Sequence, residues 1–248
     1  MRAIFSPIYA IVLLSFLWIN PTATASTTEA LPNSQQTVIL IHGLGRSGKA
    51  MWLLESRLSR AGYSVITLDY SSLRAEPDDI IESVVEQLDE CCKHASTVHF
   101  IGHSLGGLVI RAYLAQPESQ KLNEKLGRVV MMGTPNSGTQ IVNHFQHYAW
   151  FHWLGPATLS LSTDPTSFPN RLATPSFQAG IIAGTNGWLA SNAIFNEPND
   201  GLVAVAETHL PNMADFIALD VSHSMMRYNK EVASQTLYFL EHGRFYHQ

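Results

Sequence analysis

Short apolar segments alternate with helical segments from residue 37 onwards, and this alternation constrains the fold more than any other feature of the sequence. It is typical of a parallel sheet covered by helices. We expect strands at Thr37–Ile41, Ser64–Leu68, Val98–Ile101, Val129–Met132, Ile181–Ala183 and Phe216–Leu219. We expect helices near Lys49–Ala61, Pro77–Cys92, Ser104–Gln116 and Ser224–Leu240. The pattern therefore predicts an α/β domain.

The first residues have the pattern of a secretory signal peptide. Arg2 is the only charged residue before residue 29, and Ile8–Ile19 is almost entirely apolar. Ala23-Thr24-Ala25 then supplies the small residues of a cleavage site. The apolar segment is short for a membrane span, which needs roughly 20 residues. We therefore expect residues 1–25 to be removed near Ala25, the protein to be exported to the periplasm or beyond, and residues 26–248 to form one domain.

Charge and cysteine content exclude several classes of protein. The formal net charge is −5 and no basic run is present, so nucleic acid is a poor candidate partner. The two cysteines, Cys91 and Cys92, are adjacent and too close together for ordinary disulfide geometry. At the end of an amphipathic helix, Cys92 is expected in the core and Cys91 as an exposed thiol.

The third predicted strand runs directly into Gly102-His103-Ser104-Leu105-Gly106, and an apolar helix follows. G-x-S-x-G between a strand and a helix is the pattern of a nucleophile elbow, in which the serine hydroxyl projects from a sharp turn. Gly102 and Gly106 are expected because a side chain at either position would collide where strand and helix nearly touch. Ser104 is therefore the candidate nucleophile.

A serine nucleophile needs an adjacent base, and the base needs a carboxylate to orient it. Asp200 lies in a turn-forming cluster between the fifth and sixth predicted strands, and His223 follows the sixth strand. This chain order of serine, acid and histidine is the one expected for such an elbow. We predict a triad of Ser104, Asp200 and His223. Taken singly, Asp200 could be an ordinary turn residue and His223 a helix cap, and Asp215 and Asp220 are competing acids.

The segment VILIHGLGRSGKA at residues 38–50 fits three different loops. Its glycines match a dinucleotide-binding fingerprint, with Asp69 in the place of the ribose-binding acid. It also nearly matches a triphosphate-binding loop, but Ala50 offers no hydroxyl for Mg²⁺. An exported protein has little dinucleotide to bind. We therefore interpret the segment as an oxyanion loop, in which the Leu44 and Leu105 N–H groups face the developing oxyanion.

These motifs together resemble the α/β-hydrolase superfamily, and within it the small bacterial serine lipases and esterases. The matching segments are VILIHGLG, HFIGHSLGG, VVMMGTPNSGT, the NDG that carries Asp200 and the VSH that carries His223. They span residues 37–240. The resemblance implies an α/β-hydrolase fold, ester hydrolysis and a mechanism without a cofactor. The chain lacks sequence for the first two strands of larger members, so we expect a minimal, mostly parallel sheet of six strands with helices on both faces.

Residues 140–175 interrupt the alternation with a cluster of aromatic residues followed by four prolines. We expect a lid-like insert that covers the acyl pocket and makes transient contact with a lipid interface, although the rings could instead complete the core. The cluster consists of Phe145, Tyr148, Trp150, Phe151 and Trp153. The same segment contains His144, His147 and His152, but no further ligand at a suitable spacing, so we predict no metal site.

The sequence thus predicts a serine ester hydrolase that acts on an ester or lipid through an acyl-enzyme. Two alternatives stay open. An acyltransferase would use the same triad, with an alcohol in place of water. A non-catalytic binding protein on a hydrolase scaffold would be expected to have lost a triad residue or an elbow glycine, and this chain retains all of them.

Overall fold

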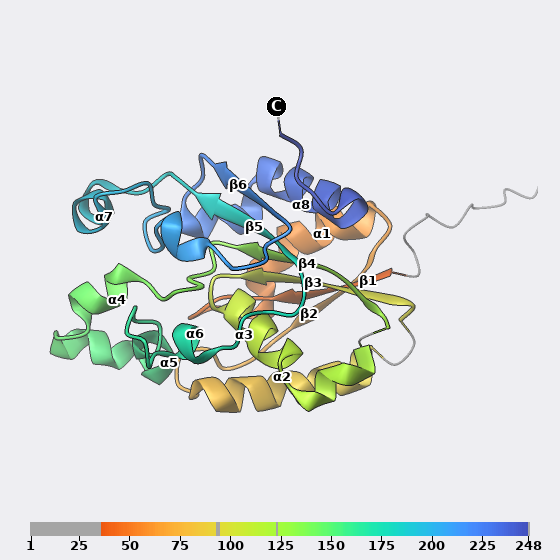
Figure 1. The fold of residues 1–248 in the computed structure, drawn as a ribbon, viewed down its shortest axis with the longest axis horizontal. Coiled ribbons are helices and arrows are strands. Elements are labelled where there is room, and N and C mark those ends of the chain that lie inside the picture. The colour runs from red at the N-terminus through yellow and green to blue at the C-terminus, as the bar shows by residue number, and fades with distance from the viewer. Residues whose placement is uncertain (1–35, 93–94, 123, 248) are drawn as a thin grey trace, which may run out of the picture. The chain divides into compact units, whose positions relative to one another are not determined.

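The computed structural model describes residues 36–92, 95–122 and 124–247, and its centre is a six-stranded sheet (Figure 1). The strands lie in the order β2-β1-β3-β4-β5-β6, and every neighbouring pair is parallel. Their bounds are β1 Gln36–Ile41, β2 Ser64–Leu68, β3 Thr97–His103, β4 Leu126–Met132, β5 Ala179–Gly184 and β6 Asp215–Leu219. The predicted parallel six-stranded α/β sheet is confirmed. The predicted signal peptide lies outside the described residues.

Helices cover both faces of the sheet, because the strands are apolar on both sides. In Figure 1, α1 (Trp52–Arg60) and α8 (Lys230–His242) lie above the sheet, and α2 (Pro77–Cys91) and α3 (Leu105–Leu114) lie below it. Alternate residues of each strand point to opposite faces. Val38 and Leu40 of β1 therefore join the core under α1 and α8, whereas Ile39 and Ile41 join the core under α2 and α3.

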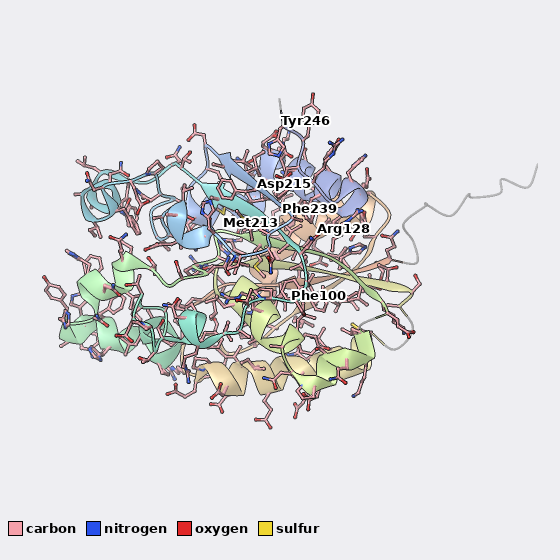
Figure 2. All side chains as sticks on the ribbon, viewed as in Figure 1. Phe100, Arg128, Met213, Asp215, Phe239 and Tyr246 are labelled. Carbon is pink, nitrogen blue, oxygen red and sulfur yellow. The ribbon has the colours of Figure 1, made fainter. Side chains whose placement is uncertain are left out.

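Figure 2 shows the same division in the aromatic side chains, with Phe100 of β3 on the α3 side and Phe239 of α8 on the other. Cys92 is buried in the α2 and α3 core, as predicted, whereas the side chain of Cys91 lies outside the described residues. No helix in the described part of the chain is both long and apolar enough to cross a membrane.

Two predicted helices differ in detail from the structure. The first begins as the 3₁₀ helix η1 (Gly48–Met51) before α1. The last is interrupted at Asn229, between the 3₁₀ helix η5 (His223–Tyr228) and α8. The Asn229 side chain accepts hydrogen bonds from the backbone N–H groups of Glu231 and Val232, so it caps α8 and ends the preceding turn. His223 thereby starts a short, separate helix at the end of the loop after β6.

The remaining helices are short and lie in the connections around the sheet. They are η2 Pro117–Leu122, α4 Gln140–Phe145, η3 Ala149–Leu154, α5 Pro156–Leu159, α6 Phe168–Arg171, α7 Leu189–Phe195 and η4 Ala206–Thr208. Four of them, α4, η3, α5 and α6, lie within the insert at residues 140–175.

The aromatic rings of this insert divide between core and surface. Phe151 is only 4% exposed and packs in the core, whereas Trp153 is 87% exposed. Tyr148 and Trp150 are also exposed, and both contact the ring of Phe145. The core interpretation therefore holds for Phe151, and the partly buried Phe145 packs against the same core. A role of the exposed rings as a lid stays a prediction.

Candidate active site

Ser104 occupies the sharp turn between β3 and α3, in a conformation that is unusual for a residue with a side chain. Its φ of 57° and ψ of −125° lie outside the regions that L-residues normally occupy. The turn is held by the Ser104 N–H group, which donates to the Met132 carbonyl of β4 at 2.9 Å. A Cβ atom on Gly102 would lie 2.5 Å from the Gly107 nitrogen, and one on Gly106 would run into the Ile41 carbonyl. Neither glycine position has room for a side chain.

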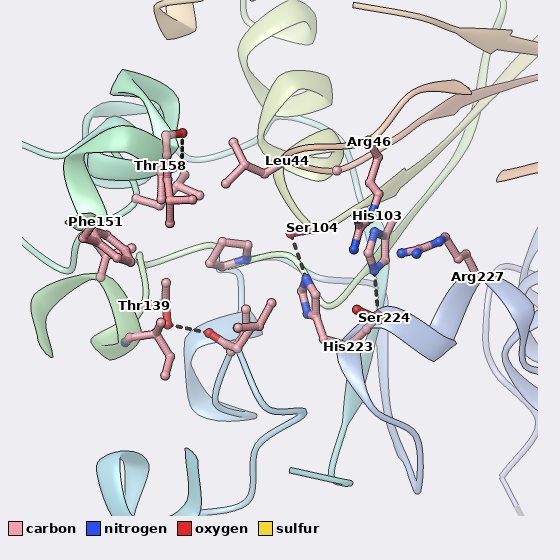
Figure 3. A pocket seen from close by; sticks show the side chains of 18 residues that line it. Leu44, Arg46, His103, Ser104, Thr139, Phe151, Thr158, His223, Ser224 and Arg227 are labelled. Carbon is pink, nitrogen blue, oxygen red and sulfur yellow. Dashed lines mark hydrogen bonds between the residues drawn. The ribbon is translucent and has the colours of Figure 1, made fainter. Parts of the chain in front are cut away.

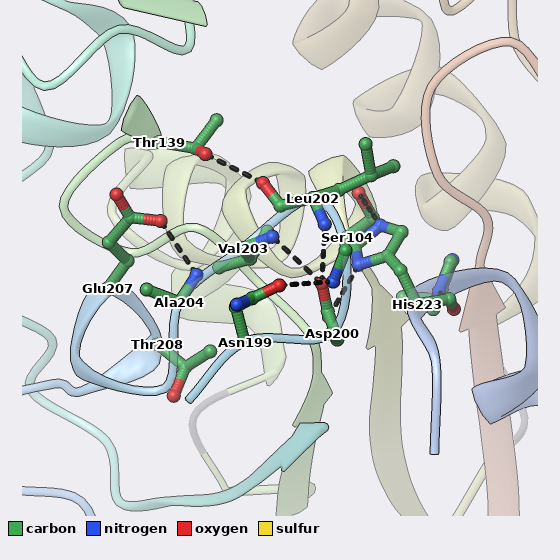
Figure 4. A network of polar contacts seen from close by, with 12 residues as sticks. Ser104, Thr139, Asn199, Asp200, Leu202, Val203, Ala204, Glu207, Thr208 and His223 are labelled. Carbon is green, nitrogen blue, oxygen red and sulfur yellow. Dashed lines mark hydrogen bonds and ion pairs between the residues drawn. The ribbon is translucent and has the colours of Figure 1, made fainter. Parts of the chain in front are cut away.

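The structure brings the three predicted triad residues into one hydrogen-bonded chain (Figure 4). His223 Nε2 lies 2.9 Å from Ser104 Oγ, and His223 Nδ1 lies 2.7 Å from Asp200 Oδ2. All three residues are buried, and the carboxylate carries no exposed side-chain surface. Because a carboxylate only accepts hydrogen bonds, Nδ1 of His223 carries the proton and Nε2 is free to accept one from the serine.

The turn that carries Asp200 fixes the orientation of its carboxylate (Figure 4). Oδ1 accepts from the backbone N–H groups of Leu202 at 2.9 Å and Val203 at 2.8 Å, which leaves Oδ2 for His223. The competing acids are engaged elsewhere: Asp220 accepts from the Asn186 side chain, and Asp215 accepts from the Phe245 N–H group. Asp200 is therefore the acid that contacts His223.

His103, to which the sequence assigned no chemical role, holds the backbone of His223. Its Nε2 lies 2.9 Å from the His223 carbonyl oxygen, and the two rings are 4.8 Å apart. Since a carbonyl only accepts, His103 Nε2 is the donor. Burial keeps the pKa of His103 well below its ordinary value, so the ring is neutral. His103 is thus a positioning residue for the base.

The loop after β1 passes directly beside Ser104. A Cβ atom on Gly43 would lie 2.9 Å from the Ser104 Cβ atom. Within the described residues, the backbone N–H groups of Leu44 and Leu105 donate to no acceptor, although Leu105 is buried and Leu44 is partly buried. Asp69, the acid of the dinucleotide-like pattern, instead accepts from the Gly48 N–H group at 3.2 Å and stabilises this loop.

A cavity of about 210 Å³ opens beside Ser104. In Figure 3, Phe151 and Thr158 lie at one end, Arg46 and Arg227 lie at the other, and Ser104 lies between them. The apolar end is lined mainly by residues of the insert: Ile141, Val142, Phe151, Leu154 and Leu161. The cavity is therefore apolar at one end and basic at the other.

Two further residues that the sequence analysis did not identify support the acid. Gly133, in the GTPNSG motif, has a φ of 57°, and a Cβ atom there would lie 3.0 Å from Asp200 Oδ2. Glu207 is buried and accepts from the N–H groups of Ala204 and Gln140, so it joins the acid turn to the start of α4 (Figure 4). Burial raises the pKa of Glu207 to about 7. Gly133 could have been identified from its motif, whereas no sequence pattern indicates Glu207.

Within the part of the chain that the structure describes, no group of three or more histidine, cysteine, aspartate or glutamate side chains is placed to hold a metal ion. His152 Nε2, one of the histidines of the insert, hydrogen-bonds to the Gln146 carbonyl instead.

Comparison with known families and structures agrees with this architecture. The family model described as "Domain of unknown function (DUF7379)" matches residues 16–172, which is more than half of the chain. The fold is also similar to that of lipase BlEst2 from Bacillus licheniformis in its mature form. That structure has a TM-score of 0.69 and 18% sequence identity, and the alignment covers 86% of this chain and 92% of the lipase.

Two larger proteins contain a similar fold. Phospholipase PlaB from Legionella pneumophila, in complex with thio-NAD, has a TM-score of 0.64 at 17% identity, over 83% of this chain and 57% of the phospholipase. Aspergillus fumigatus lipase B has a TM-score of 0.64 at 15% identity, over 88% of this chain and 55% of the lipase. The chain thus spans little more than half of these two proteins. At these identities the likeness establishes an α/β-hydrolase fold, as the sequence motifs predicted.

Proposed function

The chain belongs to the family described as "Domain of unknown function (DUF7379)" and has an α/β-hydrolase fold, and we propose that it is a serine ester hydrolase. The observation that carries this proposal is the hydrogen-bonded chain from Ser104 through His223 to Asp200 at the wall of a cavity. The unpaired N–H groups of Leu44 and Leu105 beside the same serine support it further.

The geometry supports hydrolysis through an acyl-enzyme. His223 Nε2 takes the proton from Ser104 Oγ as this oxygen attacks the ester carbonyl carbon. Asp200 holds the Nδ1–H tautomer of His223 and stabilises the imidazolium that forms. The Leu44 and Leu105 N–H groups donate to the oxyanion. His223 then gives its proton to the departing alcohol, and water releases the acid in a second attack.

Labelling with a fluorophosphonate probe tests the proposal directly. We expect the purified protein to react at Ser104, identified by mass spectrometry of the modified peptide, and to hydrolyse p-nitrophenyl butyrate. Ser104→Ala is the matched control and should do neither. An unlabelled Ser104 together with no ester turnover would favour a binding protein on this scaffold. Product analysis with an added acceptor alcohol separates hydrolysis from acyl transfer.

The size of the cavity favours short acyl groups. About 210 Å³ is less than the roughly 300–1,000 Å³ of typical small-molecule sites. A series of p-nitrophenyl esters of increasing acyl length should therefore reach its highest kcat/KM at a short chain. A maximum of kcat/KM at a long acyl chain would show that the insert moves and enlarges the cavity.

The insert at residues 140–175 is proposed to contact lipid interfaces transiently. Tyr148, Trp150 and Trp153 expose large rings, and Phe151 and Leu154 of the same segment line the cavity. Tryptophan and tyrosine favour the boundary between apolar and aqueous phases. Activity on an ester measured below and above its solubility limit tests this proposal. A rate that does not rise beyond the solubility limit would argue against interfacial contact.

Export is the remaining part of the proposal, and it rests on the signal-like sequence before Ala25. The mass of the protein recovered from the culture medium or periplasm of an expressing bacterium should match residues 26–248. Recovery of the full-length chain from the cytoplasm alone would contradict it.

A further inference from the structure

Two arginine side chains lie at the basic end of the cavity without a carboxylate partner. Arg227 is 6% exposed, and its Nε–H group has no hydrogen-bond acceptor. Arg46 is exposed at the cavity wall and donates only to the Gly45 carbonyl, at 3.4 Å. Among the described residues, neither guanidinium has a carboxylate within 4.0 Å.

An arginine buried in this way is costly unless an anion accompanies it. Guanidinium groups remain charged in proteins, and removing an unpaired charge from water is strongly unfavourable. The face of the Tyr228 ring, 4.8 Å from the Arg227 guanidinium carbon, supplies only a weak cation–π contact. No acidic residue lines the cavity, although the whole chain has a net charge of −5. The missing partner of Arg227 is therefore expected to come from outside the chain.

The position of His223 indicates which part of the substrate meets the arginines. Because His223 gives its proton to the departing alcohol, the alcohol must leave on the side of Ser104 that faces His223. Arg227 lies on the same short helix as His223, η5, whereas the apolar end of the cavity is built by the insert. In Figure 3 the guanidinium groups of Arg46 and Arg227 lie beside His103, on the His223 side of the serine. The acyl chain thus faces the insert, and the alcohol faces the arginines.

We propose that the alcohol part of the substrate carries an anionic group, a phosphate or a carboxylate, which Arg227 and Arg46 bind. This inference rests on the proposed esterase function. The planar guanidinium donates paired hydrogen bonds to the oxygens of either anion. Arg227 meets the anion inside the cavity, and Arg46 closes over it from the mouth. His103, kept neutral, adds no charge to this end of the site.

Three butyrate esters that differ only in the leaving alcohol test this proposal: those of meta-hydroxybenzamide, meta-hydroxybenzoate and meta-hydroxyphenyl phosphate. The first is neutral, the second carries a carboxylate and the third a phosphate. We expect at least one anionic ester to exceed the neutral ester in kcat/KM by roughly tenfold or more, as a charged hydrogen-bonded pair allows. The ester that is preferred identifies the anion.

Variants then assign the preference to the two arginines. Arg227→Met and Arg46→Met should each move the ratio of anionic to neutral kcat/KM towards one, while Arg227→Lys retains part of it. Arg60→Met removes the same charge from an exposed site on α1 and is the control, with an unchanged ratio. Since both esters are measured on one sample, partial loss of folded protein cancels in the ratio of the two kcat/KM values. If the Arg227 variant does not fold, the Arg46→Met variant still tests the inference, because Arg46 is exposed.

The outcomes separate this inference from the proposed function. A neutral ester hydrolysed through Ser104 with no preference for either anionic ester would overturn the inference alone. A preference that survives both Arg227→Met and Arg46→Met would overturn it as well. No Ser104-dependent hydrolysis of any ester would refute the proposed function and the inference with it.

Discussion

Asp200→Asn is the substitution for which the structure gives the most definite expectation. Oδ1 of Asp200 accepts two backbone N–H groups, from Leu202 and Val203, and Oδ2 accepts His223 Nδ1–H. An asparagine side chain has a single oxygen, which can accept either from the two backbone N–H groups or from His223, but not from both. Facing its oxygen towards His223 would put its NH₂ group against two N–H donors and leave both unsatisfied, at a cost of about 1–3 kcal/mol each.

The amide oxygen will therefore stay with the backbone N–H groups, and the NH₂ group will face His223. His223 Nδ1 must then accept, so its proton moves to Nε2, the atom 2.9 Å from Ser104 Oγ. In that tautomer His223 cannot take the serine proton. The same substitution in a serine protease lowers kcat on the order of 10⁴-fold, which corresponds to about 5.5 kcal/mol.

The assay is steady-state hydrolysis of p-nitrophenyl butyrate, with the concentration of active sites fixed by probe titration. We expect kcat to fall by roughly 10⁴-fold while the unfolding midpoint in urea changes little, because the two backbone hydrogen bonds are kept. Asp220→Asn is the matched control, since Asp220 contacts the exposed Asn186 side chain. The reasoning is refuted if Asp220→Asn abolishes turnover while Asp200→Asn retains more than about a tenth of it.

Three further predictions concern the nucleophile, the insert and pH. Ser104→Ala should remove on the order of 10⁶ in rate, as for other serine nucleophiles, with an unchanged melting temperature; appreciable activity in the purified variant would show that another serine reacts. Replacing both Trp150 and Trp153 by alanine should change the acyl-length preference with little change in melting temperature, because both rings are exposed; a much lower melting temperature with the same preference would make the rings structural. Burial raises the pKa of Glu207 from 4.5 to about 7, so the folded state binds the proton more tightly than the unfolded state. The free energy of unfolding should therefore fall as pH rises from about 4.5 to about 7, by on the order of 3 kcal/mol from this group. Urea unfolding at several pH values should show a smaller dependence of the free energy of unfolding on pH in Glu207→Gln than in the unsubstituted protein. An equal dependence in both proteins would contradict this prediction.

The sheet was predictable because each strand is a short apolar segment that ends at a turn, and both faces are buried. The elbow was predictable because Gly102 and Gly106 leave no room for side chains, a local requirement that a motif records. The position of Asp200 followed from chain order, although its contact with His223 depends on a turn that no pattern specifies.

The parts that escaped prediction depend on contacts between distant segments. His103 is an ordinary residue of the elbow motif until β6 and η5 bring the His223 carbonyl to its ring. Arg227 lies close to His223 in sequence, but its burial without a carboxylate depends on the packing around the cavity. The break at Asn229 was missed because helical periodicity continues across it, and only the capping hydrogen bonds separate the two helices.

The hydrogen bonds at the start of the insert have a consequence for how the protein can be altered. Thr139, just before the insert, donates to the Leu202 carbonyl, and the Gln140 N–H group donates to Glu207, so the start of the insert is attached to the turn that carries Asp200. Most of the apolar wall of the cavity then follows between Ile141 and Leu161, and Leu202 and Val203 of the Asp200 turn complete it. We expect a chimera that keeps Thr139 and Gln140, and exchanges only the segment after them, to acquire the acyl-binding wall of the protein that donates the segment. Ser104, Asp200 and His223 stay on loops that the exchange does not touch.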